Sequence, residues 1–234
     1  MNPKLNLGPK MGPNLFTMTG SMHGGELDLA VVVPTYKERD NIVLLFQRLE
    51  RVLAGKRWEV VFVDDNSPDG TADAVRDLAL QDSRVRLIRR IGRRGLASAC
   101  IEGMLATTAS FVAVMDADLQ HDETILPEML DRIQRDSLDL VIASRNAQGG
   151  SMGQFVAQRV WLSNLGARFS SAVTRCHLSD PMSGFFVLNY RFLDAVAPRL
   201  SGVGFKILLD IVASADGPVR FAEVPYTFRQ RQHG

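Results

Sequence analysis

The sequence has little of what marks secreted, membrane-spanning or nucleic-acid-binding proteins. Its two cysteines, Cys100 and Cys176, have no metal-ligand spacing, and we expect them to be small buried thiols in a reducing compartment. No apolar run reaches the ~18–20 residues that a membrane span needs, and the Gly/Pro/Met-rich stretch 1–26 has no signal-peptide apolar region. The net charge of +1 gives no electrostatic reason to expect nucleic-acid binding. We therefore expect a protein that is not secreted and has no nucleic-acid partner.

Several common catalytic signatures are also missing. No Walker loop, no G-x-G-x-x-G and no Ser-His-Asp arrangement is visible in the sequence, which weakens the P-loop, dinucleotide-binding and hydrolase hypotheses. The composition is that of an ordinary globular protein, with 46% hydrophobic and 23% charged residues, and it can bury a large core without disulfides. We expect a flexible leader over residues 1–26 and one folded domain over residues 27–234.

From Leu27 onward, apolar β-rich runs alternate with amphipathic helical stretches. The runs predict strands at 27–33, 58–63, 85–88, 111–115 and 138–144. Apolar, β-branched strands separated by helices are typical of a parallel sheet covered on both faces. The predicted fold class is therefore α/β and Rossmann-like, with a mostly parallel central sheet. After Gly150 the alternation stops, and the helices expected near 191–198 and 204–214 are peripheral.

Residues 111–121 read FVAVMDADLQH and carry the strongest chemical signal in the chain. Asp116, Asp118 and Gln120 alternate after a strand, and alternate side chains of an extended segment share one face. Two carboxylates and one amide oxygen suit Mg²⁺ or Mn²⁺, whose other ligands are usually water and substrate phosphate. The pattern predicts a divalent metal site in a phosphate-handling enzyme. His121 is expected to be a loop residue, because these ions prefer oxygen ligands.

Ligands of open α/β sheets bind beyond the carboxyl ends of the strands, where polar residues gather in this sequence. The ring of Tyr36 can stack on a base, and Glu38 can accept hydrogen bonds from base or sugar. Asp65 either joins an Asx-turn or accepts hydrogen bonds from a nucleotide, and spacing alone does not choose between the two. Arg145 stands alone at a strand end, where a guanidinium suits an anionic group. The arginines of 89–94 are expected to form a solvated loop.

Taken together, these segments resemble the family 2 glycosyltransferases of GT-A fold, and more narrowly the dolichol- or polyprenol-phosphate mannosyltransferases. The matching pieces are VVVPTYKERDNI, VVFVDDNSPDGTAD, RRGLASACIEG, VMDADLQHDE, LVIASRN, LSDPMSGFF and EVPYTFRQRQHG. The resemblance extends over residues 29–234. DADLQ is widespread among such transferases, whereas DDNSPDGT together with DPMSGFF is far more specific to the prenyl-phosphate branch.

The resemblance implies an inverting, metal-dependent transfer of mannose from GDP-mannose to a dolichyl or polyprenyl phosphate, with 27–234 as the catalytic domain. It implies donor binding by Pro34, Tyr36, Glu38, Asp65, Asp116, Ala117, Asp118 and Arg231. It implies a Mg²⁺ or Mn²⁺ site at Asp116, Asp118 and Gln120, and acceptor binding by Arg145 and Ser183. The catalytic residues it implies are Asp118, Arg145 and Arg231.

The same resemblance implies contact with a membrane surface. Segment 154–175 corresponds to amphipathic helices that lie at the membrane, and Trp161 and Phe169 are its candidates for the headgroup level. The chain is therefore expected to be peripheral on the cytoplasmic side of a membrane.

The chain departs from the family pattern at several positions. Lys37 stands where Asn is frequent, and Ala97 where Gly is usual. The family typically continues past Gly234, which predicts a catalytic piece truncated before C-terminal membrane segments.

Two alternative functions stay open. A UDP-glucose-dependent polyprenyl-phosphate glucosyltransferase would share the fold, metal and acceptor, and no residue decides which base is recognised. A non-catalytic nucleotide-binding module would bind nucleotide without turnover.

Overall fold

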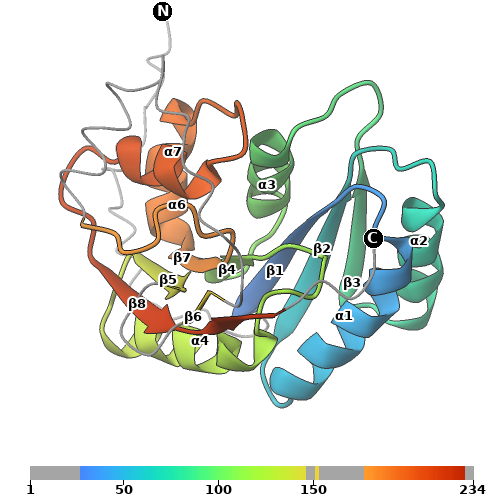
Figure 1. Cartoon of the computed structure of the whole chain (residues 1–234), viewed down its shortest axis with the longest axis horizontal. Helices are drawn as coiled ribbons and strands as arrows, with labels where there is room; N and C mark the ends of the chain where they lie inside the picture. Colours follow the sequence, from blue (N-terminus) through green and yellow to red (C-terminus); the bar gives the residue numbers. More distant parts are fainter. Residues whose placement is uncertain (1–26, 146–150, 153–176, 230–234) are drawn as a thin grey trace, which may run out of the picture.

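The computed structural model describes residues 27–145, 151–152 and 177–229 (Figure 1). Its first half contains β1 (Leu29–Thr35), α1 (Arg39–Val52), β2 (Trp58–Asp64), α2 (Thr71–Gln81), β3 (Val85–Arg89), α3 (Leu96–Leu105), β4 (Phe111–Val114), η1 (Glu123–Ile125), α4 (Leu126–Arg135) and β5 (Leu140–Ser144). Its second half contains β6 (Ser151–Met152), β7 (Phe186–Asn189), α6 (Tyr190–Val196), η2 (Ala197–Arg199), α7 (Ile207–Ala213), β8 (Phe221–Pro225) and β9 (Thr227–Phe228). None of the helices in these ranges is both long and apolar enough to cross a membrane. The predicted leader 1–26, the predicted membrane-surface segment 154–175 and Arg231 lie outside the described residues.

Seven strands form one sheet in the order β3-β2-β1-β4-β7-β5-β8. Within it only β7 runs antiparallel to the others, and it pairs with β4 on one side and β5 on the other. All seven residues of β1 and of β2 are buried, as expected for strands covered on both faces. A short parallel pair joins β6 to β9. The prediction of an α/β fold with a mostly parallel sheet is confirmed.

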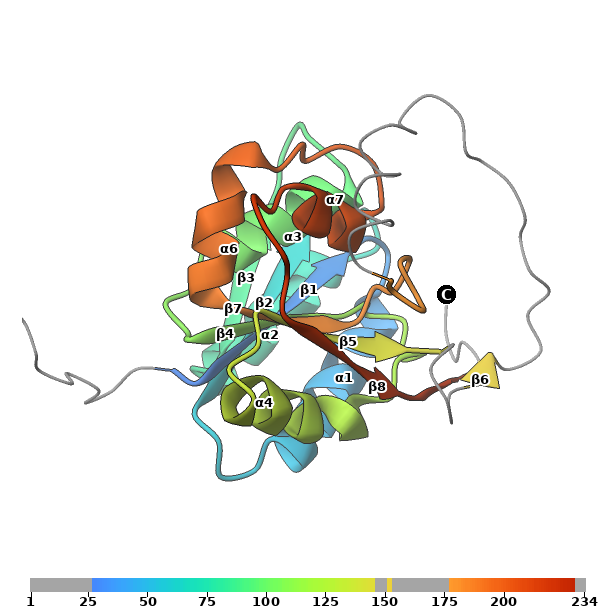
Figure 2. The ribbon, with the colours of Figure 1, turned by 90° about the vertical axis from the view of Figure 1, so that its left-hand side faces the viewer.

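Helices cover both faces of this sheet (Figure 2). Helices α1, α2 and α4 pack on one face, and α3, α6 and α7 pack on the other. Alternation along β1 divides its side chains between the two layers, since Val31 and Val33 face the first and Val32 faces the second. In α1 the buried apolar residues recur every three or four positions, at Ile42, Leu45, Phe46 and Leu49. Each layer is therefore built from one face of amphipathic helices.

The parallel strands end at one edge of the sheet, and β7 begins at that same edge because it runs the other way. The last residue of β4, Val114, lies opposite the first residue of β7, Phe186. On the β5 side, the backbone N–H of Ala143 donates to the carbonyl of Phe185 at 2.9 Å. The loop that precedes β7 is thereby placed beside the residues that follow β4 and β5.

Gly103 of α3 lies where this helix closely approaches the sheet. A Cβ added there would overlap Cγ1 of Val32 and lie 2.8 Å from Cγ2 of Val63. We predict that Gly103→Ala lowers the free energy of unfolding by about 1–3 kcal/mol, because the added methyl overpacks the contact. Gly217→Ala is the control, since nothing lies within 4 Å of its added Cβ. Urea denaturation measures both variants, and equal stabilities would contradict the prediction.

Candidate active site

Asp116 and Asp118 follow β4 at the carboxyl edge of the sheet, but they do not lie on an extended segment. Strand β4 ends at Val114, the chain then bends, and Leu119 has a positive φ of 62°. The prediction that both aspartates and Gln120 alternate along one extended face is therefore wrong. Instead, Oδ1 of Asp118 accepts a hydrogen bond from the backbone N–H of Gln120 at 3.0 Å, which closes a tight Asx-type turn.

Gln120 is held by the chain segment that follows β9. Its side-chain Nε2 donates to the carbonyl of Arg229 at 3.1 Å, and its own carbonyl accepts from the backbone N–H of Arg229 at 2.8 Å. The guanidinium of Arg229 also pairs with Asp122 at 2.6 Å and with Glu123 at 2.8 Å. These contacts attach the loop after Asp118 to Arg229, the residue directly after β9. The assignment of Gln120 as a metal ligand stays a prediction.

Asp116 is hydrogen-bonded to a buried histidine that is itself hydrogen-bonded. Nε2 of His121 lies 3.1 Å from Oδ2 of Asp116, and Nδ1 lies 3.0 Å from the hydroxyl of Tyr226. An ionised carboxylate only accepts hydrogen bonds, so this contact places a proton on Nε2. Burial raises the pKa of Tyr226, which keeps its hydroxyl protonated and able to donate to Nδ1. The three side chains form a chain of hydrogen bonds that ends on Asp116.

Aromatic packing fixes the orientation of the His121 ring. Only 3% of His121 is exposed. Its ring centroid lies 5.3 Å from that of Phe185, 5.9 Å from that of Tyr226 and 5.5 Å from that of Phe228. The expectation of an ordinary loop histidine missed this burial. His121 and Tyr226 are 105 residues apart, so only the fold brings them together.

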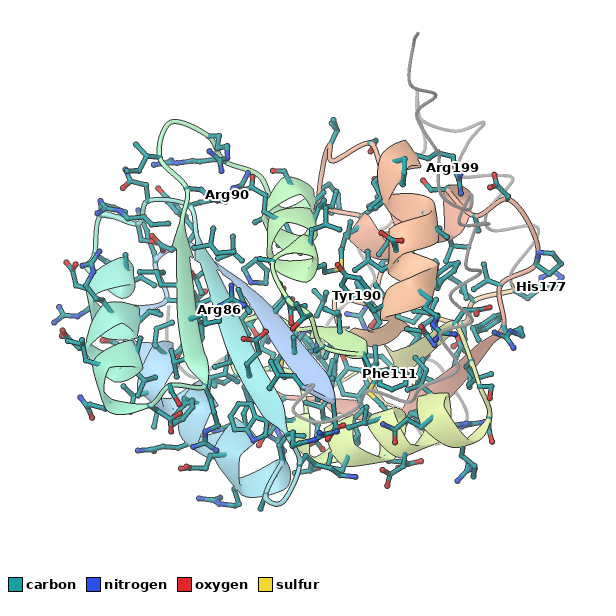
Figure 3. The ribbon with its side chains drawn as sticks, turned by 180° about the vertical axis from the view of Figure 1, so that it is seen from behind. Arg86, Arg90, Phe111, His177, Tyr190 and Arg199 are labelled. Atoms are coloured by element: carbon teal, nitrogen blue, oxygen red, sulfur yellow. The ribbon has the colours of Figure 1, made fainter. Side chains whose placement is uncertain are left out.

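Asp65 directly follows β2 and forms a buried ion pair with Arg90. Nη1 of Arg90 is 2.7 Å from Oδ1 of Asp65, and the backbone N–H of Gly95 donates to Oδ2 at 2.8 Å. Arg90 also donates to Oγ of Ser98 at 2.6 Å. The expectation of a solvated loop is wrong for Arg90, whose exposed fraction is 1%. Figure 3 shows it beside the N-terminal end of α3.

The loop after β1 is fastened to the loop after β2. The backbone N–H of Lys37 donates to Oγ of Ser67 at 3.0 Å, and that of Glu38 donates to Oγ1 of Thr71 at 3.1 Å. Lys37 has a positive φ of 61°, a conformation that Asn adopts more readily than Lys. The predicted donor-binding residue Glu38 is thereby held close to the loop that follows Asp65.

Tyr36 lies on the loop after β1, at the same edge. It is 42% exposed, and the guanidinium carbon of Arg94 lies 4.6 Å from the centre of its ring. Pro34 lies buried within β1, because that strand continues to Thr35. Of the predicted donor residues that follow the first strand, only Tyr36 and Glu38 are therefore on the loop itself.

Arg145 is paired with a residue that the sequence did not single out. Its Nε is 2.7 Å from Oδ2 of Asp180 and its Nη2 is 2.9 Å from Oδ1, so the pair is bidentate. This hydrogen bonding raises the pKa of Arg145. Ser183, the other predicted acceptor residue, is 3% exposed and donates to the carbonyls of Ala143 at 2.7 Å and Phe185 at 3.1 Å. Its hydroxyl shapes the turn into β7, and these contacts give no support to its predicted role in acceptor binding.

The carboxylates at this edge fit a cation that takes most of its ligands from elsewhere. No three His, Cys, Asp or Glu side chains form a metal-binding group in the part of the chain that the structure describes. A Cβ at Gly184 would lie 3.0 Å from Oδ2 of Asp116, so the glycine leaves space beside this carboxylate. Mg²⁺ typically takes one or two protein carboxylates and fills its other positions with water and phosphate. Asp116 and Asp118 are suited to that kind of site.

The fold is shared with solved glycosyltransferase structures. Glucosyl-3-phosphoglycerate synthase from Mycobacterium tuberculosis, solved with Mn²⁺, UDP and glucosyl-3-phosphoglycerate, has a TM-score of 0.65 at 16% identity, over 90% of this chain and 73% of that one. A mannosyltransferase from Pyrobaculum calidifontis, solved with GDP-mannose and Mn²⁺, has a TM-score of 0.61 at 20% identity, over 88% of this chain and 57% of that one. The expected GT-A fold is confirmed.

Curated relatives match over most of the chain. Dolichol-phosphate mannosyltransferase of Pyrococcus furiosus is 36% identical over 89% of this chain, and the chain spans 58% of that protein's length. The enzyme of the same description from Saccharomyces cerevisiae is 36% identical over 89% of this chain and 80% of its own length. Undecaprenyl-phosphate mannosyltransferase of Micrococcus luteus is 31% identical over 87% of this chain and 84% of its own length.

The family match includes the strand ends described above. The family described as "Glycosyl transferase family 2" matches residues 30–196, which is more than half of the chain and contains Tyr36, Asp65, Asp116 and Arg145. The chain therefore belongs to glycosyl transferase family 2.

Proposed function

We propose that the chain transfers mannose from GDP-mannose to a dolichyl or polyprenyl phosphate, with inversion at the anomeric carbon. The observation that carries this proposal is the gathering of Tyr36, Asp65 and Asp116 at one sheet edge in a chain that is 36% identical to dolichol-phosphate mannosyltransferases. Tyr36 would stack on the base, and Asp65, held by Arg90, would accept hydrogen bonds from base or ribose. Arg231 would contact the donor diphosphate.

In this proposal Asp116 and Asp118 bind Mg²⁺ or Mn²⁺. When bound, the cation supplies positive charge that offsets the charge developing on the GDP leaving group. Support comes from the space beside Oδ2 of Asp116 at Gly184 and from the Mn²⁺ present in two solved structures of the same fold. The tight turn at Asp118 and the hydrogen bond from His121 to Asp116 hold the two carboxylates in fixed positions.

The acceptor phosphate would supply the nucleophilic oxygen, because its oxygens are already ionised at neutral pH. The reaction therefore needs no strong protein base. His121 suits this scheme, since it is buried and both of its ring nitrogens are in hydrogen bonds, to Asp116 and to Tyr226. A single displacement by the phosphate oxygen inverts the anomeric carbon. Arg145, positioned by Asp180, would provide positive charge near the acceptor phosphate.

We propose that the protein acts at the surface of a membrane, because its proposed acceptor is a lipid, and we assign it to the cytoplasmic side as the family resemblance implies. Segment 154–175, with Trp161 and Phe169, is the proposed membrane contact. Trp161→Glu combined with Phe169→Glu should abolish co-sedimentation with liposomes that contain anionic lipid. Unchanged co-sedimentation would argue against this contact.

A transfer assay tests the proposed function directly. GDP-mannose and UDP-glucose, each radiolabelled in the sugar, are compared as donors with geranyl phosphate as acceptor and Mn²⁺ present. Transfer of mannose alone supports the proposal, and transfer of glucose alone identifies the UDP-glucose-dependent alternative. Calorimetric titration with GDP and with UDP then reports base preference. Nucleotide binding without transfer from either donor would identify a non-catalytic module.

His121 should act on the metal through Asp116. We predict that His121→Phe weakens Mn²⁺ binding in the presence of GDP by about 10–100-fold, the usual cost of losing a partner of a ligating group. Phe fits the aromatic surroundings but cannot donate to Oδ2 of Asp116. Titration by electron paramagnetic resonance measures the free Mn²⁺.

Two variants control this measurement. His121→Gln places an amide N–H near the position of Nε2 and should restore part of the affinity. His177→Phe changes an exposed histidine at the border of the molecule (Figure 3) and should leave Mn²⁺ binding unchanged. Equal Mn²⁺ affinities of wild type and His121→Phe would show that His121 does not influence metal binding.

A further inference from the structure

A cavity of about 190 Å³ lies beside Asp116. Its walls come from α3, from the end of β4, from the loop before β7 and from the start of α7. About half of the wall is apolar, with Leu96, Val114, Met182, Phe205 and Ile207 among its residues. Cys100 belongs to the same wall, and burial raises the pKa of its thiol, so it behaves as a small apolar side chain.

The mouth of this cavity has an exposed apolar rim. Leu96 is 37% exposed, Met182 43% and Phe205 65%, and all three line the cavity. Val203, two residues before Phe205, is 73% exposed. Large apolar side chains grouped at a concave site mark a binding surface more often than scattered ones do.

The loop that carries Val203 and Phe205 is held in place at both ends. The carboxylate of Asp210 accepts from the backbone N–H of Ser201 at 2.8 Å and from its hydroxyl at 2.9 Å. The carbonyl of Gly204 accepts from the backbone N–H of Ala97 at 3.1 Å, which ties the loop to α3. The exposure of the two apolar side chains is therefore built into the fold.

The cavity also contains two charged residues of opposite sign. Asp116 and Lys206 both line it, and Nζ of Lys206 lies 5.6 Å from the centre of the Phe205 ring. The exposed side chains of Leu96, Met182 and Phe205 offer no hydrogen-bond partner to a sugar hydroxyl. An isoprenoid phosphate has a branched apolar chain that matches these side chains and an anionic head that matches the ammonium group of Lys206.

We propose that this cavity and its rim bind the isoprene units nearest the phosphate of the lipid acceptor. Val203 and Phe205 then contact the chain as it leaves the protein, and Lys206 attracts the phosphate towards Asp116 and its metal. The proposal rests on the proposed function, because it names the part of the acceptor that this site recognises. It gives the catalytic edge a second apolar surface, formed by residues distant in sequence from segment 154–175.

The test is the double variant Val203→Ser with Phe205→Ser, in the full chain. Both side chains are exposed, so the fold should be retained, and Leu80→Ser, at an 83% exposed leucine on α2, is the matched control. The KM for geranyl phosphate should rise about tenfold, equal to about 1.4 kcal/mol of binding free energy. The KM for GDP-mannose should stay within about twofold, and the control should match wild type in both.

The outcomes separate this proposal from its alternatives. An unchanged KM for geranyl phosphate overturns it, and a rise confined to the KM for GDP-mannose overturns it in favour of a sugar pocket. If wild type transfers neither sugar to geranyl phosphate, the proposed function fails. In that case, calorimetric titration with geranyl phosphate, with GDP and Mn²⁺ present, tests the proposed lipid site independently of transfer. Tighter binding to wild type than to the double variant supports the site, and equal binding or none overturns it.

Discussion

Replacement of Asp118 by Asn is expected to lower mannose transfer by roughly a thousandfold without unfolding the protein. The carboxylate is proposed to hold a cation worth several kcal/mol to the transition state, and each ~1.4 kcal/mol is a factor of ten in rate. Asn keeps the oxygen that accepts from the backbone N–H of Gln120. The turn therefore survives and the change removes mainly the charge. Initial rates at saturating GDP-mannose, over a range of Mn²⁺ concentrations, measure the effect.

Asp82→Asn is the matched control for this experiment. Oδ1 of Asp82 accepts from the backbone N–H of Arg84, two residues ahead, at 2.9 Å, which repeats the local pattern of Asp118. It precedes β3 and so lies at the opposite edge of the sheet. Its transfer rate should equal that of wild type. Near-normal transfer by Asp118→Asn, with metal present, would end the metal-assisted mechanism.

Arg90→Met is expected to lower the free energy of unfolding by about 3–5 kcal/mol, the usual cost of removing one partner of a buried ion pair. The change leaves the carboxylate of Asp65, which is only 8% exposed, without the guanidinium that pairs with it. That loss is a large fraction of the ~5–15 kcal/mol of an ordinary domain. Urea denaturation followed by far-ultraviolet circular dichroism measures it.

An exposed pair provides the comparison. Arg76 and Asp73 form an ion pair on the surface of α2, with side chains 52% and 71% exposed, and such pairs contribute about 0–1 kcal/mol. Arg76→Met should therefore leave stability nearly unchanged. If Arg90→Met lowered the free energy of unfolding no more than Arg76→Met does, the Asp65–Arg90 pair would not stabilise the fold.

The layers of the fold and the edge that carries the site could be predicted from the sequence, because buried parallel strands consist of continuous apolar, β-branched runs. Strand ends were less predictable. The predicted first strand, 27–33, stops before Pro34, yet Pro34 lies within β1, which pairs with β4 only as far as Val32. Beyond Val32 the strand has a partner on one side only, a position where the missing N–H of proline is tolerated.

Local sequence patterns could not predict the contacts within the candidate site. Nothing in a run of arginines distinguishes Arg90, whose guanidinium donates to Asp65, just after β2, and to the carbonyl of Gly95. The pairing of Arg145 with Asp180 depends on the direction of β7, and strand direction is not encoded in the residues of the strand itself. The roles predicted for Asp116 and Asp118 stay predictions until metal binding is measured.

The reversed direction of β7 also returns the chain to the edge of the sheet that it has just left. The chain leaves the sheet after β5 at Ser144 and returns at Phe186, on the neighbouring strand and at the same edge. Both ends of this excursion therefore contribute to the edge that carries the aspartates. Arg145, just after β5, pairs with Asp180, and Gly184, just before β7, lies beside Oδ2 of Asp116.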